Sequence, residues 1–258
     1  MEYDNKVQMI ELFLSCDKLP NKFDEKDRRR VECNVENIRK HLIRVAYTLT
    51  EIFKKADEED KANLITVYAQ SYPLICDYFN WWLSNPSRED VDNFLRGILM
   101  VYAWMPRILR IHTENESFRG NAKVLKTIDF LRDLKKYPEY DRRGKDSVYS
   151  FLGENQDKVN DLKNIVDNSL TATAKILHFV RLDDFPIWDS CIASKFGKTN
   201  TIKNYFDFLK SFEDFRLKYK NEIDDVLSNN SIDCIKGVGA ARLVELSIYL
   251  PEVNISRE

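Results

Sequence analysis

Residues Ser169–Ala193 read SLTATAKILHFVRLDDFPIWDSCIA, a run of small and apolar residues followed by a short proline-containing loop. The first part is typical of a closely packed helix, and we expect that helix to extend over residues 158–181. Asp189 follows the loop and is a preferred N-cap residue, so a second helix is predicted over residues 189–196. The stretch therefore predicts two helices joined by a short turn.

The rest of the 258-residue chain indicates an all-α fold. Only 7 Gly and 7 Pro are present, too few for the frequent turns of a sandwich or barrel. No segment shows a convincing alternation of apolar and polar residues, as a strand would. We expect a multi-helix bundle of about ten helices, which include 58–70, 73–83, 121–136, 199–211, 213–228 and 239–250.

A polar segment between Thr113 and Ser147 is the best candidate for a domain boundary, because Gly120, Pro138 and Gly144 punctuate it. We therefore predict an N-terminal helical domain over residues 1–145 and a C-terminal helical domain over residues 146–258.

The N-terminal part holds the clearest helical periodicity. Between residues 24 and 55, apolar residues alternate spacings of four and three, which places one stripe along a long helix. The stripe fits a bundle helix packed inside its own domain, and it also fits a seam for a second copy of the chain. A homo-oligomer formed through residues 31–52 is one expectation. The stripe consists of Val31, Val35, Ile38, Leu42, Val45, Leu49 and Ile52.

Composition excludes several classes of protein. The 40 Lys and Arg residues balance 42 Asp and Glu residues, so the chain carries no polybasic excess. The N-terminus lacks the pattern of a secretory signal and no apolar run is long enough to cross a bilayer, so we expect a cytoplasmic protein without membrane contact. The five cysteines are widely spread and form no C-x-x-C pair, so they indicate neither a disulfide framework nor a structural zinc site. With three histidines and no H-x-x-x-H pair a catalytic metal site is not expected, and without a P-loop or dinucleotide fingerprint no cofactor is expected.

The segment IKGVGAARL, residues 235–243, contains two glycines just before a predicted helix. Glycines there let main-chain amides approach an anion at the positive end of the helix dipole, and a DNA phosphate suits that position. The candidate nucleic-acid-binding residues are Lys236, Gly237, Val238, Gly239 and Arg242. A tight turn or helix cap with no ligand explains the same glycines.

The Gly-Val-Gly turn resembles the hairpin of a helix-hairpin-helix element, and Ser169–Ala193 resembles part of the helix-hairpin-helix DNA glycosylase superfamily. The resemblance covers about residues 155–250. It implies a DNA-binding protein in which Asp189 assists loss of a base from a flipped nucleotide, and Lys175 is the nucleophile if the protein is bifunctional. It also implies that the C-terminal domain is helix-hairpin-helix-like.

The chain departs from that family in the order of its motifs. In the family the glycine hairpin precedes the lysine and the aspartate, whereas here Gly237 follows Asp189. Lys175 also lies one turn beyond the position that the family's spacing indicates, so its nucleophilic role requires a shortened loop.

The same residues also have simpler explanations. Asp189 is explained by capping alone, Lys175 by a solvated helix face, and His178 by a hydrogen-bonded core position. A non-enzymatic helical module that binds nucleic acid or protein is therefore the alternative function. Arg107 and His112 are similar to the short signature of the HEPN ribonucleases, which gives a third option, although Ile108 stands where that signature is usually polar.

Overall fold

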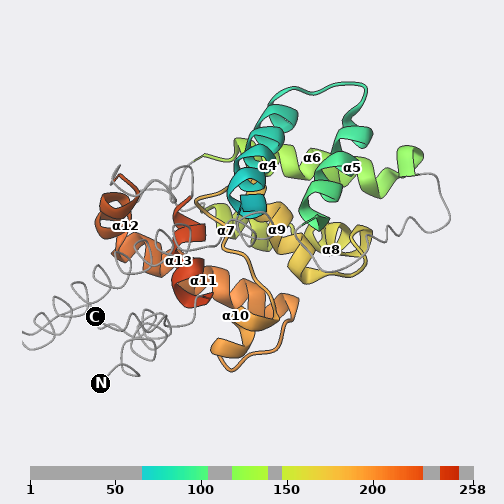
Figure 1. The fold of residues 1–258 in the computed structure, drawn as a ribbon. Coiled ribbons are helices and arrows are strands. Elements are labelled where there is room, and N and C mark those ends of the chain that lie inside the picture. Colours follow the sequence, from blue (N-terminus) through green and yellow to red (C-terminus); the bar gives the residue numbers. More distant parts are fainter. Residues whose placement is uncertain (1–65, 104–117, 139–146, 229–238, 250–258) are drawn as a thin grey trace, which may run out of the picture.

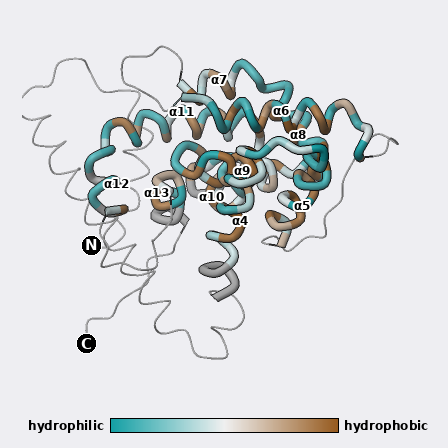
Figure 2. Tube along the Cα trace, turned by 90° about the horizontal axis from the view of Figure 1, so that it is seen from above, coloured by the Kyte–Doolittle hydropathy of each residue, from teal (hydrophilic) through white to brown (hydrophobic). Residues whose placement is uncertain are grey.

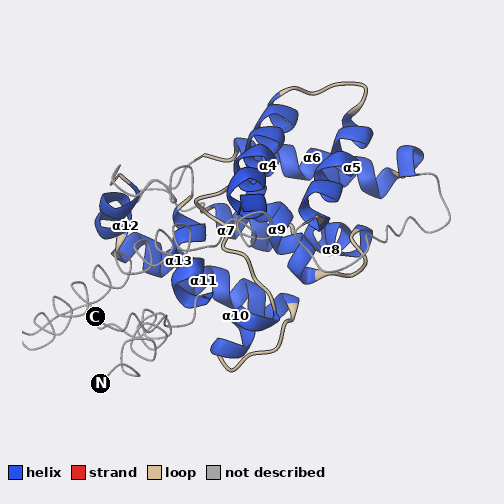
Figure 3. Cartoon of the chain, in the orientation of Figure 1, coloured by secondary structure: helices blue, strands red, loops and turns tan. Residues whose placement is uncertain are grey.

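The computed structural model describes residues 66–103, 118–138, 147–228 and 239–249. Within these ranges the chain forms helices and loops without a strand, which confirms the predicted all-α fold (Figure 3). The α-helices are α4 (Thr66–Ser84), α5 (Asp90–Tyr102), α6 (Ala122–Lys136), α7 (Val148–Glu154), α8 (Gln156–Ile165), α9 (Leu170–Val180), α10 (Ser190–Lys195), α11 (Ile202–Lys218), α12 (Lys220–Leu227) and α13 (Ala240–Tyr249). A short 3₁₀ helix, η3, spans Phe118–Gly120.

Helix α9 is the central element of the bundle (Figure 1). It packs against α4, α5, α6 and α8, and nearly all of its side chains are buried. The small residues Ala172 and Ala174 are fully buried, which lets neighbouring helices approach closely. Small side chains suit these positions of α9, because neighbouring helices surround it instead of covering one face.

Helices α7 and α10–α13 lie beside this central group (Figure 1). Figure 2 shows hydrophobic and hydrophilic residues alternating along α11, as expected for a helix with one buried stripe. Phe208, Phe212 and Phe215 form part of that stripe. One hydrophobic cluster extends from Tyr72 to Val244 and includes residues from both predicted domains. The division at residues 145 and 146 stays a prediction, and that point lies outside the described residues.

Several helix boundaries differ from those predicted. The helix expected over 158–181 is two helices, because Asp167 and Asn168 adopt positive φ angles of 57° and 54° and end α8 before Ser169 starts α9. The predicted break near residue 212 is absent, since Phe212 and Phe215 are both buried and the helix continues to Lys218. The two helices predicted over 58–70 and 73–83 are replaced, in the described residues, by the single helix α4, which contains Pro73. Tyr72 and Ile75 are buried on either side of that proline.

No helix in the described part of the chain is long and apolar enough to cross a membrane. The 31–52 stripe, and with it the expected homo-oligomer, lies outside the described residues.

Candidate functional site

Lys175 is half-buried on the central helix α9. The helix begins after Ser169, whose hydroxyl accepts the Ala172 amide at 3.2 Å, and this cap fixes the register of the residues that follow. Burial lowers the pKa of the Lys175 amine to about 8, and the charge of Arg242 acts in the same direction. Asp189 opposes this shift, so its carboxylate lies within electrostatic range of the amine.

Asp189 is held by the residues that precede it. Phe185 and Trp188 are almost fully buried, and the Trp188 ring lies 4.8 Å from that of Phe208 on α11. Asp189 then caps α10, because its Oδ1 accepts the Ile192 amide at 2.8 Å. The predicted N-cap role is therefore confirmed. One carboxylate oxygen makes the cap, while the charge of the group still acts on Lys175.

Helix α13 adds Arg242 to this site. Arg242 is 9% exposed and forms an ion pair with Glu245, which is itself 2% exposed. Its positive charge lowers the pKa values of both Lys175 and His178. The sequence indicated Arg242 as a nucleic-acid contact. The structure buries most of its side chain, and its nucleic-acid-binding role stays a prediction.

Gly239 packs against the loop that follows α9. A Cβ atom there would lie 2.4 Å from the carbonyl oxygen of Leu182, so the position excludes any side chain. The next amide, that of Ala240, donates to Asp183 Oδ1 at 2.7 Å. The anion found at the start of α13 is thus the chain's own carboxylate. The phosphate-binding role of Gly239 stays a prediction, and Lys236, Gly237 and Val238 lie outside the described residues.

His178 is a core residue, as predicted. It is fully buried and bonded on both ring nitrogens, to Phe185 O and to the Tyr72 hydroxyl, each at 2.8 Å. The carbonyl can only accept, so Nδ1 carries the proton and Nε2 accepts from Tyr72. Burial lowers the pKa of His178 to about 3, with a smaller effect from Arg242, and the ring is neutral.

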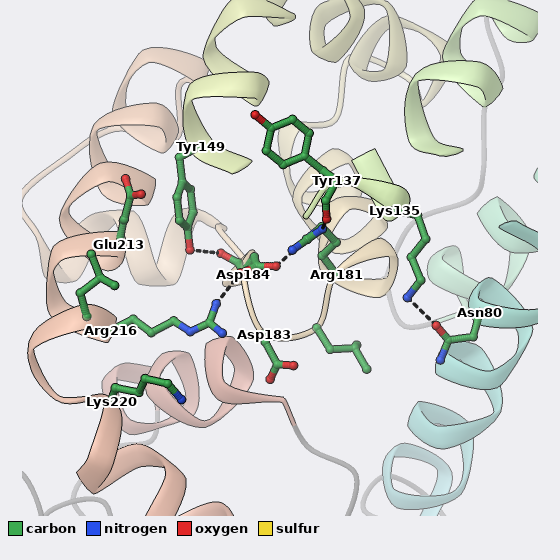
Figure 4. A pocket seen from close by; sticks show the side chains of 12 residues that line it. Asn80, Lys135, Tyr137, Tyr149, Arg181, Asp183, Asp184, Glu213, Arg216 and Lys220 are labelled. Carbon is green, nitrogen blue, oxygen red and sulfur yellow. Dashed lines mark hydrogen bonds and ion pairs between the residues drawn. The ribbon is translucent and has the colours of Figure 1, made fainter. Parts of the chain in front are cut away.

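A pocket of about 430 Å³ opens at the C-terminal end of α9 (Figure 4). Asp184 lies at its base, 6% exposed, and forms ion pairs with Arg181 and Arg216. The Tyr149 hydroxyl donates to the Asp184 carbonyl oxygen at 2.7 Å. Sequence analysis missed this pocket because Arg216 reaches Asp184 only through the packing of α11. The adjacent Asp183 and Asp184 in a loop were the one local signal.

No group of three or more His, Cys, Asp or Glu side chains within the described ranges could hold a metal ion. Arg107 and His112 lie outside those ranges. No family model, curated protein or solved structure matches the chain.

Proposed function

We propose that this protein is a DNA-glycosylase-like enzyme that binds DNA and removes a base, with Lys175 as the nucleophile. The supporting observation is the environment of this amine: it is half-buried, its pKa is about 8, and the Asp189 carboxylate acts on it electrostatically. An amine with that pKa is neutral in about one molecule in ten at pH 7, far more than an ordinary lysine.

In the proposed reaction the neutral Lys175 amine attacks C1′ of a flipped nucleotide. The electron pair of the C1′–N bond leaves with the base, which takes up a proton from water, and the new ammonium loses a proton to solvent. Asp189 stabilises the positive charge that develops on the sugar. The nitrogen lone pair then forms a C1′=N double bond while the C1′–O4′ bond breaks, and O4′ takes up a proton from water, which gives a protonated Schiff base between Lys175 and C1′.

Capping does not compete with this role. The cap uses Oδ1 of Asp189 for the Ile192 amide, and capping holds the carboxylate in one orientation at the start of α10. A group fixed in this way needs no reorganisation when charge develops on the sugar, which makes its electrostatic effect larger.

The test is incubation of the full chain with duplexes that carry uracil, 8-oxoguanine, alkylated purines or an abasic site, with and without borohydride. We expect base release and a borohydride-stable covalent complex. Lys175→Gln should abolish the complex, whereas Lys203→Gln, which neutralises an exposed lysine on α11, should not.

The alternative is a non-enzymatic helical binding module, because capping of α10 by itself also accounts for Asp189. DNA binding without excision or trapping across these substrates would support that alternative. A covalent complex that persists in Lys175→Gln would exclude Lys175 as the nucleophile.

A further inference from the structure

The pocket at the C-terminal end of α9 has a positively charged base. The two oxygens of the buried Asp184 carboxylate each hold one guanidinium, Arg181 through Nε and Arg216 through Nη1. One negative charge is therefore shared between two positive charges. The single Asp184 carboxylate cannot neutralise both guanidinium groups, so the three side chains together carry one net positive charge.

Both arginines keep hydrogen-bond donors for a ligand. A guanidinium carries five N–H groups. Asp184 takes one from Arg181, and the carbonyl oxygens of Leu134 and Tyr137 accept from its Nη1 at 3.3 and 2.5 Å. These contacts lock the plane of Arg181, which is 8% exposed, so its remaining donors have a fixed direction. Arg216 is bound to Asp184 by one nitrogen and is 30% exposed.

Two lysines face the same space from opposite sides (Figure 4). Lys135 on α6 donates to the neutral Asn80 amide oxygen at 2.5 Å, and the charges of Asp183 and Asp184 act on it electrostatically. Lys220 begins α12 and is paired with the exposed Asp224. Burial and the nearby Arg181 lower the pKa of Lys135, which an anion in the pocket would reverse.

Two further carboxylates, Asp183 and Glu213, line the pocket, and the surroundings of each reduce the effect of its negative charge on a ligand. Asp183 accepts the Ala240 amide at the positive end of α13. The pKa of Glu213 is raised by burial and by nearby acids, which moves this group toward its neutral form. Four cationic side chains and three carboxylates line the pocket, and a fourth carboxylate, Asp224 outside the lining, pairs with Lys220. The arginine and lysine N–H donors at the pocket point to an oxyanion as the ligand.

We propose that this pocket binds a phosphate monoester with a polar organic part. Guanidinium groups match phosphate oxygens in geometry, and the lysines on the two sides of the pocket would complete the contacts to a tetrahedral dianion. A volume of about 430 Å³ exceeds what a phosphate group fills and lies within the range of small-molecule sites. This inference is independent of base excision, because neither Lys175 nor Asp189 lines the pocket.

The test is calorimetric titration of the full chain with adenosine 5′-monophosphate and with adenosine. We expect the monophosphate to bind at least tenfold more tightly than the nucleoside. Lys135→Gln with Lys220→Gln should weaken its binding at least tenfold and leave the Asp184 ion pairs intact. The matched control is Lys126→Gln with Lys203→Gln, which removes two exposed lysines and should bind as the wild type does.

A second pair of probes separates the two sources of such a group. A single-stranded oligonucleotide with a 5′-phosphate is compared with the same oligonucleotide carrying a 5′-hydroxyl. Binding of the phosphorylated oligonucleotide alone assigns the pocket to a nucleic-acid end, and tighter binding of the monophosphate assigns it to a free nucleotide. The proposal is overturned if neither phosphorylated probe binds, if the phosphate gives no advantage, or if the double variant binds as its control does.

Discussion

The Tyr72 hydroxyl on α4 donates to His178 Nε2 on α9 across a distance of 2.8 Å, in the centre of the core. The bond joins two residues 106 positions apart in the chain, and it exists only while the imidazole is neutral. Protonation would place a charge in the core with Arg242 nearby. This pair therefore makes the stability of the bundle depend on pH.

The free energy of unfolding should fall in acid through His178. The pKa of His178 is about 3 in the folded protein and about 6.5 when unfolded, so the unfolded chain binds the extra proton between these values. The stabilisation is complete above about pH 6.5 and is lost as the pH falls toward 3, by roughly 1.4 kcal/mol per unit. Urea denaturation at pH 7, 6 and 5 measures this slope. His178→Gln should lower the slope by about one proton, and an unchanged slope would contradict the assignment.

Gly239→Ala should destabilise the protein by about 1–3 kcal/mol, because the new methyl group meets the rigid carbonyl of Leu182. The matched control is Gly153→Ala in α7, where an added Cβ has no neighbour within 4 Å. That change should be neutral or stabilise by up to about 1 kcal/mol. Thermal melting of both variants measures the difference. Equal Tm values would contradict the prediction and would show that α13 shifts away from Leu182 without loss of stability.

Two substitutions separate the roles of Asp189. Asn is nearly as good an N-cap as Asp, so Asp189→Asn should cost no more than about 0.5–1 kcal/mol, whereas Asp189→Ala should cost about 1 kcal/mol or more. Removal of the charge should lower any excision rate roughly a hundredfold in both variants while DNA binding persists. Melting curves and single-turnover excision give the two readouts. Full excision activity in Asp189→Asn would leave Asp189 as a cap alone.

Schiff-base formation by Lys175 should rise with pH, because only the neutral amine attacks. With a pKa of about 8, the trapping rate should increase nearly tenfold from pH 6 to pH 7 and level off above pH 8. Arg242→Gln with Glu245→Gln removes the nearby positive charge without leaving a buried carboxylate unpaired, and it should move this profile to higher pH. A profile that stays in place would exclude Arg242 as a cause of the lowered pKa.

Local patterns in the sequence predicted the helices of the site but misplaced some of their ends. The hydrophobic period of α8 and α9 continues across Asp167 and Asn168, and it concealed a break that these residues form by adopting positive φ angles. The succession Asp167, Asn168 and Ser169 was the available signal. For α11, the burial of both Phe212 and Phe215 outweighed the polar residues around them.

The contacts that organise the site depend on tertiary packing and could not be predicted from spacing. Asp183 meets the Ala240 amide across 57 residues, and Asp184 meets Arg216 across 32. Neither partner has a local pattern that indicates the other. The sequence suggested Lys175 and Asp189 together through a short motif, whereas the influence of Arg242 on that lysine appeared only in the structure.

The docking of α13 on the loop after α9 also sets an order of events during synthesis. Helix α9 and the Asp189 cap can form once residues 169–192 have left the ribosome, but Arg242 emerges about fifty residues later, several seconds at ordinary translation rates. Until α13 arrives, Lys175 lacks a neighbouring positive charge and Gly239 is not yet seated on Leu182. Before α13 docks, the pKa of the Lys175 amine is therefore lowered by burial without the contribution of Arg242, which is added only when α13 arrives.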